Sequence, residues 1–240
     1  MSYPPLFIFR NMNIVAIETS TTVCSAALFV DGQCVKSLVD TSGQNHARQL
    51  PLFVSQLLDE SRAMNLHIDA VALSQGPGSY TGLRIGTALA KGLCYGHNIP
   101  LIAIDTLQLM AFSASRKIVI EPEVLLCPMI DARRMEVYTA LYDNNLQPVT
   151  QVEAKIIGAD SFADILAKRK VYFFGNGADK CKGILTVHNA VFIDGITPLA
   201  EDMSFLAKKL YDAREFADVA YFDPFYLKEF QATVAKNKVF

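Results

Sequence analysis

A glycine-rich turn between an apolar run and a helix-forming segment constrains this chain most. Residues 69–73, apolar apart from Asp69, are short enough for one buried strand, and Gly76-Pro77-Gly78 then interrupts regular structure. Glycine reaches backbone angles that other residues avoid, and proline has no amide N–H to donate. Ser79 and Thr81 can cap a following helix. The pattern predicts a strand, a turn and a helix N-terminus, which is either a plain connection or a place for an anion.

The helix after the turn carries small residues at four-residue spacing. Gly82, Gly86 and Ala90 share one helix face. Each glycine within a helix costs about 1 kcal/mol relative to alanine. This cost indicates a compensating close approach by another backbone, either inside the domain or from a second chain in a helix bundle.

Composition limits the class of protein. The chain has 240 residues, of which 51% are hydrophobic, and a net charge of −2. These values exclude a largely disordered chain and give no electrostatic sign of a nucleic-acid surface. The clusters Arg133-Arg134 and 168–170 are therefore interpreted as solvated faces. No apolar run is long enough to span a bilayer, and five cysteines without a CxxC motif favour a reduced, cytoplasmic setting.

The first eleven residues form a separate segment. Residues 6–9 are apolar but too short for a signal-peptide core, and Met12 directly precedes the first good strand. We expect residues 1–11 to be a disordered extension, with Met12 as the natural translation start.

The order of elements in the first half predicts a mixed sheet. Strands are expected at 13–17, 23–30, 33–39, 69–73 and 99–104, and helices at 47–64, 79–95 and 106–115. A three-stranded meander followed by alternating strands and helices is typical of a sheet that is antiparallel on one side and parallel on the other. The polar connection 117–123 is the best boundary between two lobes.

The second half is less regular. Strands are expected at 124–130, 136–142, 171–174 and 191–193, and helices at 159–170, capped by Asp160 or Ser161, and near 200–216. The predicted fold is thus α/β with two lobes, residues 12–116 and 117–240, and the C-terminal segment can pack back on the first lobe.

Few residues suggest catalysis. The four histidines lie far apart, and no HExxH or GxSxG motif occurs. Glu18 and Asp131 each end a predicted strand, so both could face a cleft between the lobes and hold Mg²⁺ indirectly. The simpler interpretation is that both bond nearby N–H groups in turns. Gly175-Asn176-Gly177 could let a nucleotide approach the backbone, but two glycines are a weak signal.

Several stretches together resemble the TsaB (YeaZ) family. They are Ile17-Glu18-Thr19-Ser20, the run Ser74 to Arg84 with its GPGSYTGLR core, Lys91-Gly92-Leu93, residues 99–104, Ile130 to Tyr138, and Pro224-Phe225-Tyr226-Leu227. The resemblance covers residues 12 to about 228, and the order and spacing of these stretches make chance a poor explanation.

The resemblance implies a fold, a pathway and partners. The implied fold is the two-lobed actin/sugar-kinase/Hsp70-like (ASKHA) fold, with a mixed sheet and packed helices in each lobe. The implied role is in the synthesis of N6-threonylcarbamoyladenosine at position 37 of tRNAs that read codons beginning with A. The chain would bind and stabilise a catalytic paralogue, TsaD, with an ATPase, TsaE, joining them, and would form a homodimer alone. It would contact tRNA only through the complex, and it would not bind a membrane.

The resemblance also implies the absence of catalysis by this chain. The catalytic paralogue carries an HxxxH metal pair after the strand that matches 99–104, and those positions are Thr106 and Met110 here. Hydroxyl and thioether groups are poor ligands for the metals concerned. No cofactor of its own is therefore expected, although ATP or ADP with Mg²⁺ could bind at the joint surface of the complex. The alternatives are a stand-alone ASKHA-type ATPase or kinase that uses Glu18 and Asp131, and a glycopeptidase-like protein.

Two groups of site residues follow from these inferences. The expected partner or dimer interface lies on helices 47–64 and 79–95 and comprises Leu50, Phe53, Val54, Leu57, Tyr80, Gly82, Leu83, Gly86 and Ala90. The expected nucleotide or anion loop comprises Thr19, Ser20, Gly76, Gly78, Ser79 and Asp131. On this basis Gly86→Leu or Ala90→Arg should weaken association and leave the fold largely intact.

Overall fold

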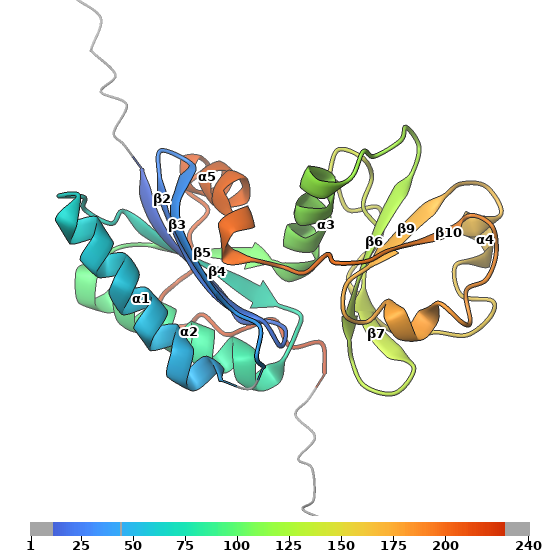
Figure 1. The fold of residues 1–240 in the computed structure, drawn as a ribbon, viewed down its shortest axis with the longest axis horizontal. Coiled ribbons are helices and arrows are strands. Elements are labelled where there is room, and N and C mark those ends of the chain that lie inside the picture. The colour runs from blue at the N-terminus through green and yellow to red at the C-terminus, as the bar shows by residue number, and fades with distance from the viewer. Residues whose placement is uncertain (1–11, 44, 229–240) are drawn as a thin grey trace, which may run out of the picture.

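The computed structural model describes residues 12–43 and 45–228, which form two lobes (Figure 1). The predicted extension 1–11 lies outside the described residues, so the start at Met12 stays a prediction. No helix of the described part is long and apolar enough to cross a lipid bilayer.

Lobe I is built on a five-stranded mixed sheet with the order β3-β2-β1-β4-β5. Its strands are β1 (Asn13–Glu18), β2 (Cys24–Val30), β3 (Gln33–Asp40), β4 (Ala70–Gly76) and β5 (Leu101–Asp105). The pairs β1–β2 and β2–β3 are antiparallel, whereas β1–β4 and β4–β5 are parallel. The predicted meander followed by parallel strands is therefore present.

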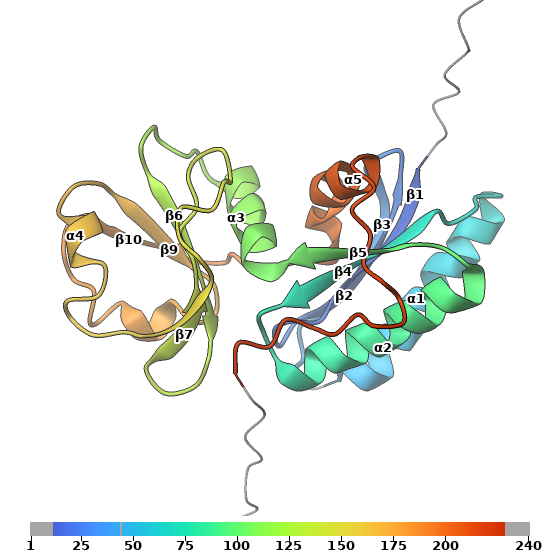
Figure 2. The same cartoon turned by 180° about the vertical axis from the view of Figure 1, so that it is seen from behind.

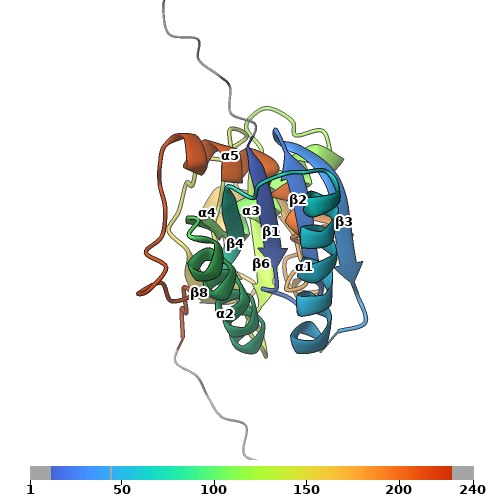
Figure 3. The ribbon, with the colours of Figure 1, turned by 90° about the vertical axis from the view of Figure 1, so that its left-hand side faces the viewer.

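Alternation along the strands of lobe I divides its core between two faces. Val15 and Ile17 of β1 point to one face, where α1 (His46–Ala63) and α2 (Tyr80–His97) pack. Ile14 and Ala16 point to the other, which is covered by α5 (Ser204–Asp212). Successive strand residues face opposite sides of a sheet, so helices cover both faces. Figure 3 shows α1 and α2 side by side across the strands.

Lobe II repeats this plan with the sheet order β10-β9-β6-β7-β8. Its strands are β6 (Leu125–Asp131), β7 (Glu136–Thr139), β8 (Glu153–Ile156), β9 (Val171–Phe174) and β10 (Ala190–Ile193). The helix α3 (Thr106–Lys117) covers one face, and α4 (Ala163–Leu166) with a 3-10 turn at Asp179–Cys181 covers the other.

The helix α3 contacts the cores of both lobes, and the C-terminal segment returns to the first one. Met110 of α3 lies in the core of lobe II, while Leu109 on the same helix lies in the core of lobe I. The chain from the 3-10 turn Ala200–Asp202 onward returns to lobe I, and its last described part runs along α2 (Figure 2). Lobe I thus includes residues from both ends of the chain.

Local predictions failed in the second half. The expected helix 159–170 shortens to α4 because Phe162 adopts a left-handed backbone (φ 64°) and packs its ring on Phe173, 5.4 Å between centroids. Neither Asp160 nor Ser161 caps this helix through its side chain. The helix near 200–216 divides at Met203, and the strand β8 had no prediction.

Candidate functional site: the interlobe cleft and the outer helix face

A cleft of about 410 Å³ lies where the two lobes meet. Lobe I contributes the turn before α2, lobe II contributes the β6–β7 hairpin, and the C-terminal segment forms a third wall. The lining residues are Pro77, Gly78, Ser79, Tyr80, Thr81, Asp131, Ala132, Arg133, Arg134, Glu136, Tyr138, Phe225, Tyr226, Leu227 and Lys228. Three of the stretches that carried the family resemblance therefore meet at one place.

The glycines of the turn allow close backbone approach. Gly76 has φ +112°, and a Cβ there would lie 2.6 Å from the carbonyl oxygen of Phe225. A Cβ on Gly78 would overlap the backbone of Ser20. The Ser79 amide donates to the Ser20 carbonyl at 2.6 Å, and the Ser79 hydroxyl accepts from the Gly82 amide at 3.2 Å. The turn is thus clamped between the β1–β2 connection and the C-terminal segment.

The predicted anion loop divides into two groups. Gly78, Ser79 and Asp131 line the cleft. Thr19, Ser20 and Gly76 are buried behind the turn and do not line it, which corrects the prediction for these three. Thr19 and Ser20 are buried because Gly78 and Ser79 cover the β1–β2 connection, and Gly76 is buried against Phe225.

Glu18 is also buried, so it does not face the cleft with Asp131. Its Oε1 accepts hydrogen bonds from the Ser20 amide at 2.6 Å and the Ser20 hydroxyl at 2.5 Å. Burial raises the pKa of Glu18, and the bonds from Ser20 oppose this rise. The Ser74 side chain also opposes the rise in the pKa of Glu18. The turn-forming interpretation therefore holds for Glu18.

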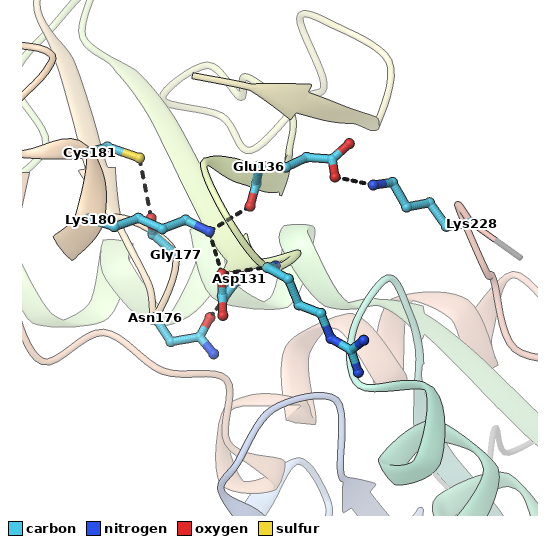
Figure 4. A network of polar contacts seen from close by, with 8 residues as sticks. Asp131, Glu136, Asn176, Gly177, Lys180, Cys181 and Lys228 are labelled. Carbon is cyan, nitrogen blue, oxygen red and sulfur yellow. Dashed lines mark hydrogen bonds and ion pairs between the residues drawn. The ribbon is translucent and has the colours of Figure 1, made fainter. Parts of the chain in front are cut away.

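Asp131 organises the hairpin of lobe II. Its carboxylate accepts from the Arg133 amide at 3.1 Å and pairs with Lys180. Lys180 also donates to the Glu136 carbonyl at 2.6 Å, and the Glu136 carboxylate pairs with Lys228 of the C-terminal segment. Figure 4 shows this network. It joins β6, β7, the Asp179–Cys181 turn and the C-terminal segment.

Most of the predicted interface residues lie inside lobe I instead. Leu50, Val54, Leu57 and Ala90 are 0–2% exposed and belong to the core between the helices and the sheet, and Leu83 is fully buried next to Gly76. Packing inside the domain thus explains them, and they are unavailable to a partner while the lobe is folded.

The two helical glycines are likewise used inside the lobe. A Cβ on Gly82 would overlap the Thr19 carbonyl oxygen, and one on Gly86 would overlap the Thr19 hydroxyl. The close approach that their cost indicated is therefore made by the chain's own β1–β2 connection. The expectation that Gly86→Leu or Ala90→Arg spares the fold is not supported by this packing.

A different set of residues forms the exposed face of α1 and α2. Ala88, Gly92 and Gly96 recur at four-residue spacing on the exposed side of α2, and a Cβ on either glycine would meet no atom within 4 Å. Leu52 of α1 is 52% exposed and Tyr95 of α2 is 87% exposed. Of the predicted interface residues, only Phe53 and Tyr80 keep part of their surface exposed. The outer face of the helix pair thus carries small residues and exposed apolar side chains.

The positions that correspond to the metal pair of the catalytic paralogue do not suit a metal. The hydroxyl of Thr106 accepts from the Gly76 amide at 3.1 Å and is fully buried. Met110 is fully buried in the core of lobe II, with its methyl group against Gly175. Gly175 and Gly177 also pack on the backbone of β6, so packing explains them. Within the described ranges, no group of three His, Cys, Asp or Glu side chains could hold a metal ion.

Sequence reasoning missed several cleft residues. Arg133 and Arg134 were interpreted as a solvated pair, and Tyr226 and Lys228 had no predicted role. Lys180, which pairs with the cleft residue Asp131, had none either. The available signal was the position of Arg133 and Arg134 directly after Asp131, at the end of a predicted strand. Their approach to the turn before α2 depends on how the lobes pack, which no local pattern encodes.

The chain is similar to proteins of one tRNA-modification pathway. A family model described as "TsaD: tRNA N6-adenosine threonylcarbamoyltransferase" matches residues 40–238. The "tRNA threonylcarbamoyladenosine biosynthesis protein TsaB" of Escherichia coli (strain K12) is 31% identical over 228 residues, covering 90% of this chain and 95% of that protein. Its namesake from Bacillus subtilis (strain 168) is 29% identical and covers 90% and 94%.

A solved structure agrees with these matches. "YeaZ from Pseudomonas aeruginosa" superposes with a TM-score of 0.76 at 26% identity and covers 90% of this chain and all of that chain. Together with the two five-stranded mixed sheets, this match confirms the two-lobed ASKHA-type α/β fold. The chain belongs to the TsaD-like proteins and, within them, to the TsaB (YeaZ) family.

Proposed function

We propose that this chain is a non-catalytic partner subunit in the synthesis of threonylcarbamoyladenosine at position 37 of tRNAs that read codons beginning with A. The relatives that match it along nearly their whole length are named as biosynthesis proteins of this modification. The chain binds and stabilises the catalytic paralogue TsaD, and TsaE joins the complex. ATP or ADP with Mg²⁺ binds at the joint surface of the complex.

The observation that carries the non-catalytic role is the use of Thr106 and Met110. Both side chains are committed to the interior: one bonds the Gly76 amide and the other fills the core of lobe II. A hydroxyl engaged in a backbone hydrogen bond and a buried thioether leave no ligand pair for a hard or borderline metal ion.

The outer face of α1 and α2 supports the partner role. Small residues at Ala88 and Gly92 allow another helix to approach closely, and the exposed side chains of Leu52 and Tyr95 supply apolar area. We assign the TsaD contact, and a homodimer of the isolated chain, to this face. The contact is thus made by exposed residues of α1 and α2 and not by the buried residues that the sequence suggested.

Depletion and complementation in the native host test this function. Depleting the protein should lower the content of threonylcarbamoyladenosine in total tRNA, measured by nucleoside mass spectrometry, and wild-type protein should restore it. Gly92→Arg should fail to restore it and should not co-sediment with TsaD. Lys168→Gln, on the exposed surface after α4, is the matched control and should behave as wild type. Unchanged nucleoside content after depletion would contradict the proposal.

A further inference from the structure

Two neighbouring arginines at the tip of the β6–β7 hairpin are held in an unusual backbone conformation. Arg133 has φ 70° and Arg134 has φ 50°, a region that residues with a Cβ rarely adopt. The Asp131 carboxylate accepts from the Arg133 amide at 3.1 Å, and the Glu136 amide donates to the Arg133 carbonyl at 3.2 Å. Lys180 ties Asp131 to the Glu136 carbonyl. The hairpin therefore presents two adjacent guanidinium groups on a fixed support.

The cleft keeps positive charge that nothing in the described chain neutralises. Its two carboxylates are already paired, Asp131 with Lys180 and Glu136 with Lys228. Neither Arg133 nor Arg134 forms an ion pair with any described residue, although both line the cleft. Guanidinium groups bind phosphate oxygens through paired N–H donors, so an unneutralised arginine pair in a cleft suits a phosphate group.

Three tyrosine side chains also line the cleft, those of Tyr80, Tyr138 and Tyr226. The rings of Tyr80 and Tyr226 lie 4.8 Å apart between centroids, inclined by 37°, and Arg84 lies over Tyr80 at 5.5 Å. Burial raises the pKa of Tyr138, and the charges of Lys228 and Arg133 oppose this rise. Aromatic rings next to basic side chains are the combination by which proteins hold unpaired nucleic-acid bases.

The geometry points to the interlobe cleft as a contact site for one unpaired nucleotide of an RNA, with its phosphodiester on Arg133 and Arg134 and its base against the tyrosine rings. This inference rests on the proposed function, because a tRNA is the substrate of that pathway. The cleft volume of about 410 Å³ is that of a small-ligand site and suits one nucleotide rather than a duplex. A free nucleotide offers the same phosphate and base, so the test separates the two sources.

The test measures RNA binding by fluorescence anisotropy, with a labelled anticodon stem-loop as the probe. It is run on this chain with TsaD and on this chain alone, at several salt concentrations. The variant is Arg133→Gln/Arg134→Gln. The matched control is Lys168→Gln/Arg169→Gln, which removes the same charge from an exposed part of lobe II that does not line the cleft.

The cleft variant should bind the RNA about tenfold more weakly, as expected for lost charge-assisted contacts. Its slope of log K against log salt should fall by about 1, while the control should match wild type. Equal affinity and equal slope for the cleft variant and wild type in both preparations would overturn the inference.

Competition identifies the source of the phosphate. ATP and AMP at millimolar concentration should leave the RNA bound; displacement that depends on the arginines would overturn the RNA assignment in favour of a free nucleotide. A failure of the proposed function would appear separately, as absence of co-sedimentation with TsaD. In that case the RNA titration of this chain alone still measures what Arg133 and Arg134 contribute to binding.

Discussion

At the scale of single residues, burial decides what a side chain does here. Glu18 and Asp131 each end a strand, yet the first is buried against Ser20 and the second is half-exposed in the cleft. Their local sequence patterns are alike, and only the packing of the turn over the β1–β2 connection separates them. The buried carboxylic acid therefore has a structural role, and the exposed one organises the hairpin.

Glu18→Gln should remove the loss of folding stability that wild type shows as the pH rises. Because burial raises the pKa of Glu18, the folded protein holds this proton to higher pH than the unfolded chain does. The stability from the neutral form is present below the ordinary carboxyl pKa and is lost as pH rises through the raised value, by at most about 1.4 kcal/mol per pH unit.

Urea unfolding of both proteins between about pH 5 and pH 8 checks this. The free energy of unfolding of the variant should decline less with pH than that of wild type. Parallel curves would show that Glu18 does not carry the dependence.

Cys34 should be the first cysteine to react with iodoacetamide in the native protein. It is the exposed one of the five; burial raises its pKa too, and raises the pKa of Cys24, Cys94 and Cys127 to about 12. Thiolates are the reactive species, so the buried thiols stay unmodified until unfolding. Mass spectrometry should find one added group on the native wild type and none on Cys34→Ser. Rapid labelling of a second site would contradict the packing described above.

At the scale of elements, α2 contains two kinds of glycine with opposite surroundings. Gly82 and Gly86 face the β1–β2 connection and have no room for a Cβ, whereas Gly92 and Gly96 face outward into open space. Four-residue spacing of small residues thus occurs on two faces of one helix. The sequence predicted a close approach on this helix, but the glycine cost alone does not say which face meets the partner.

A matched pair of alanine substitutions should separate these two faces. Gly82→Ala should destabilise the protein by about 1–3 kcal/mol, because its Cβ overlaps the Thr19 carbonyl oxygen. Gly92→Ala should stabilise it by up to about 1 kcal/mol, because alanine favours an exposed helix more than glycine does. Urea unfolding of the two variants measures both effects, and changes of the same sign would refute this assignment.

At the scale of the whole molecule, α3 and the C-terminal segment hold the two lobes together. Asp105 caps α3 by accepting from the Gln108 amide at 2.8 Å, and it also accepts from the Tyr142 hydroxyl of lobe II at 3.1 Å. Burial raises the pKa of Asp105, which the two hydrogen bonds oppose. On the cleft side, Lys228 pairs with Glu136. The lobes are therefore joined at two places.

Tyr142→Phe should lower the free energy of unfolding by about 1 kcal/mol, because it removes one buried hydrogen bond between the lobes. Tyr172→Phe is the control: its hydroxyl bonds the exposed carboxylate of Glu121 within lobe II, and its loss should cost less. Hydrogen exchange at the first turn of α3 should quicken only in Tyr142→Phe. Equal effects of the two variants would show that this bond does not couple the lobes.

Local sequence signals specify the elements of the first half, the mixed sheet and the family. Alternating apolar residues, the Asp31-Gly32 hairpin and the turn Gly76-Pro77-Gly78 are local signals, and each acts within a few residues. The predicted helix 159–170 failed because the packing of Phe162 on Phe173 outweighed local propensity. The first and last residues of the other helices and strands in the second half also depend on packing rather than on local propensity.

Only the tertiary structure decided which side of each element is buried and which distant residues meet. Hydrophobic spacing marks an apolar face but does not say whether the chain's own sheet or another protein covers it, so Leu50 and Gly86 were misassigned while Gly92 was overlooked. The same holds for the cleft. Arg133 and Tyr226 lie far apart in sequence, and they line the same cleft because the C-terminal segment returns along α2 to the hairpin of lobe II. Local sequence fixes conformation over a few residues, whereas long-range contacts depend on how whole elements bury their surfaces against one another.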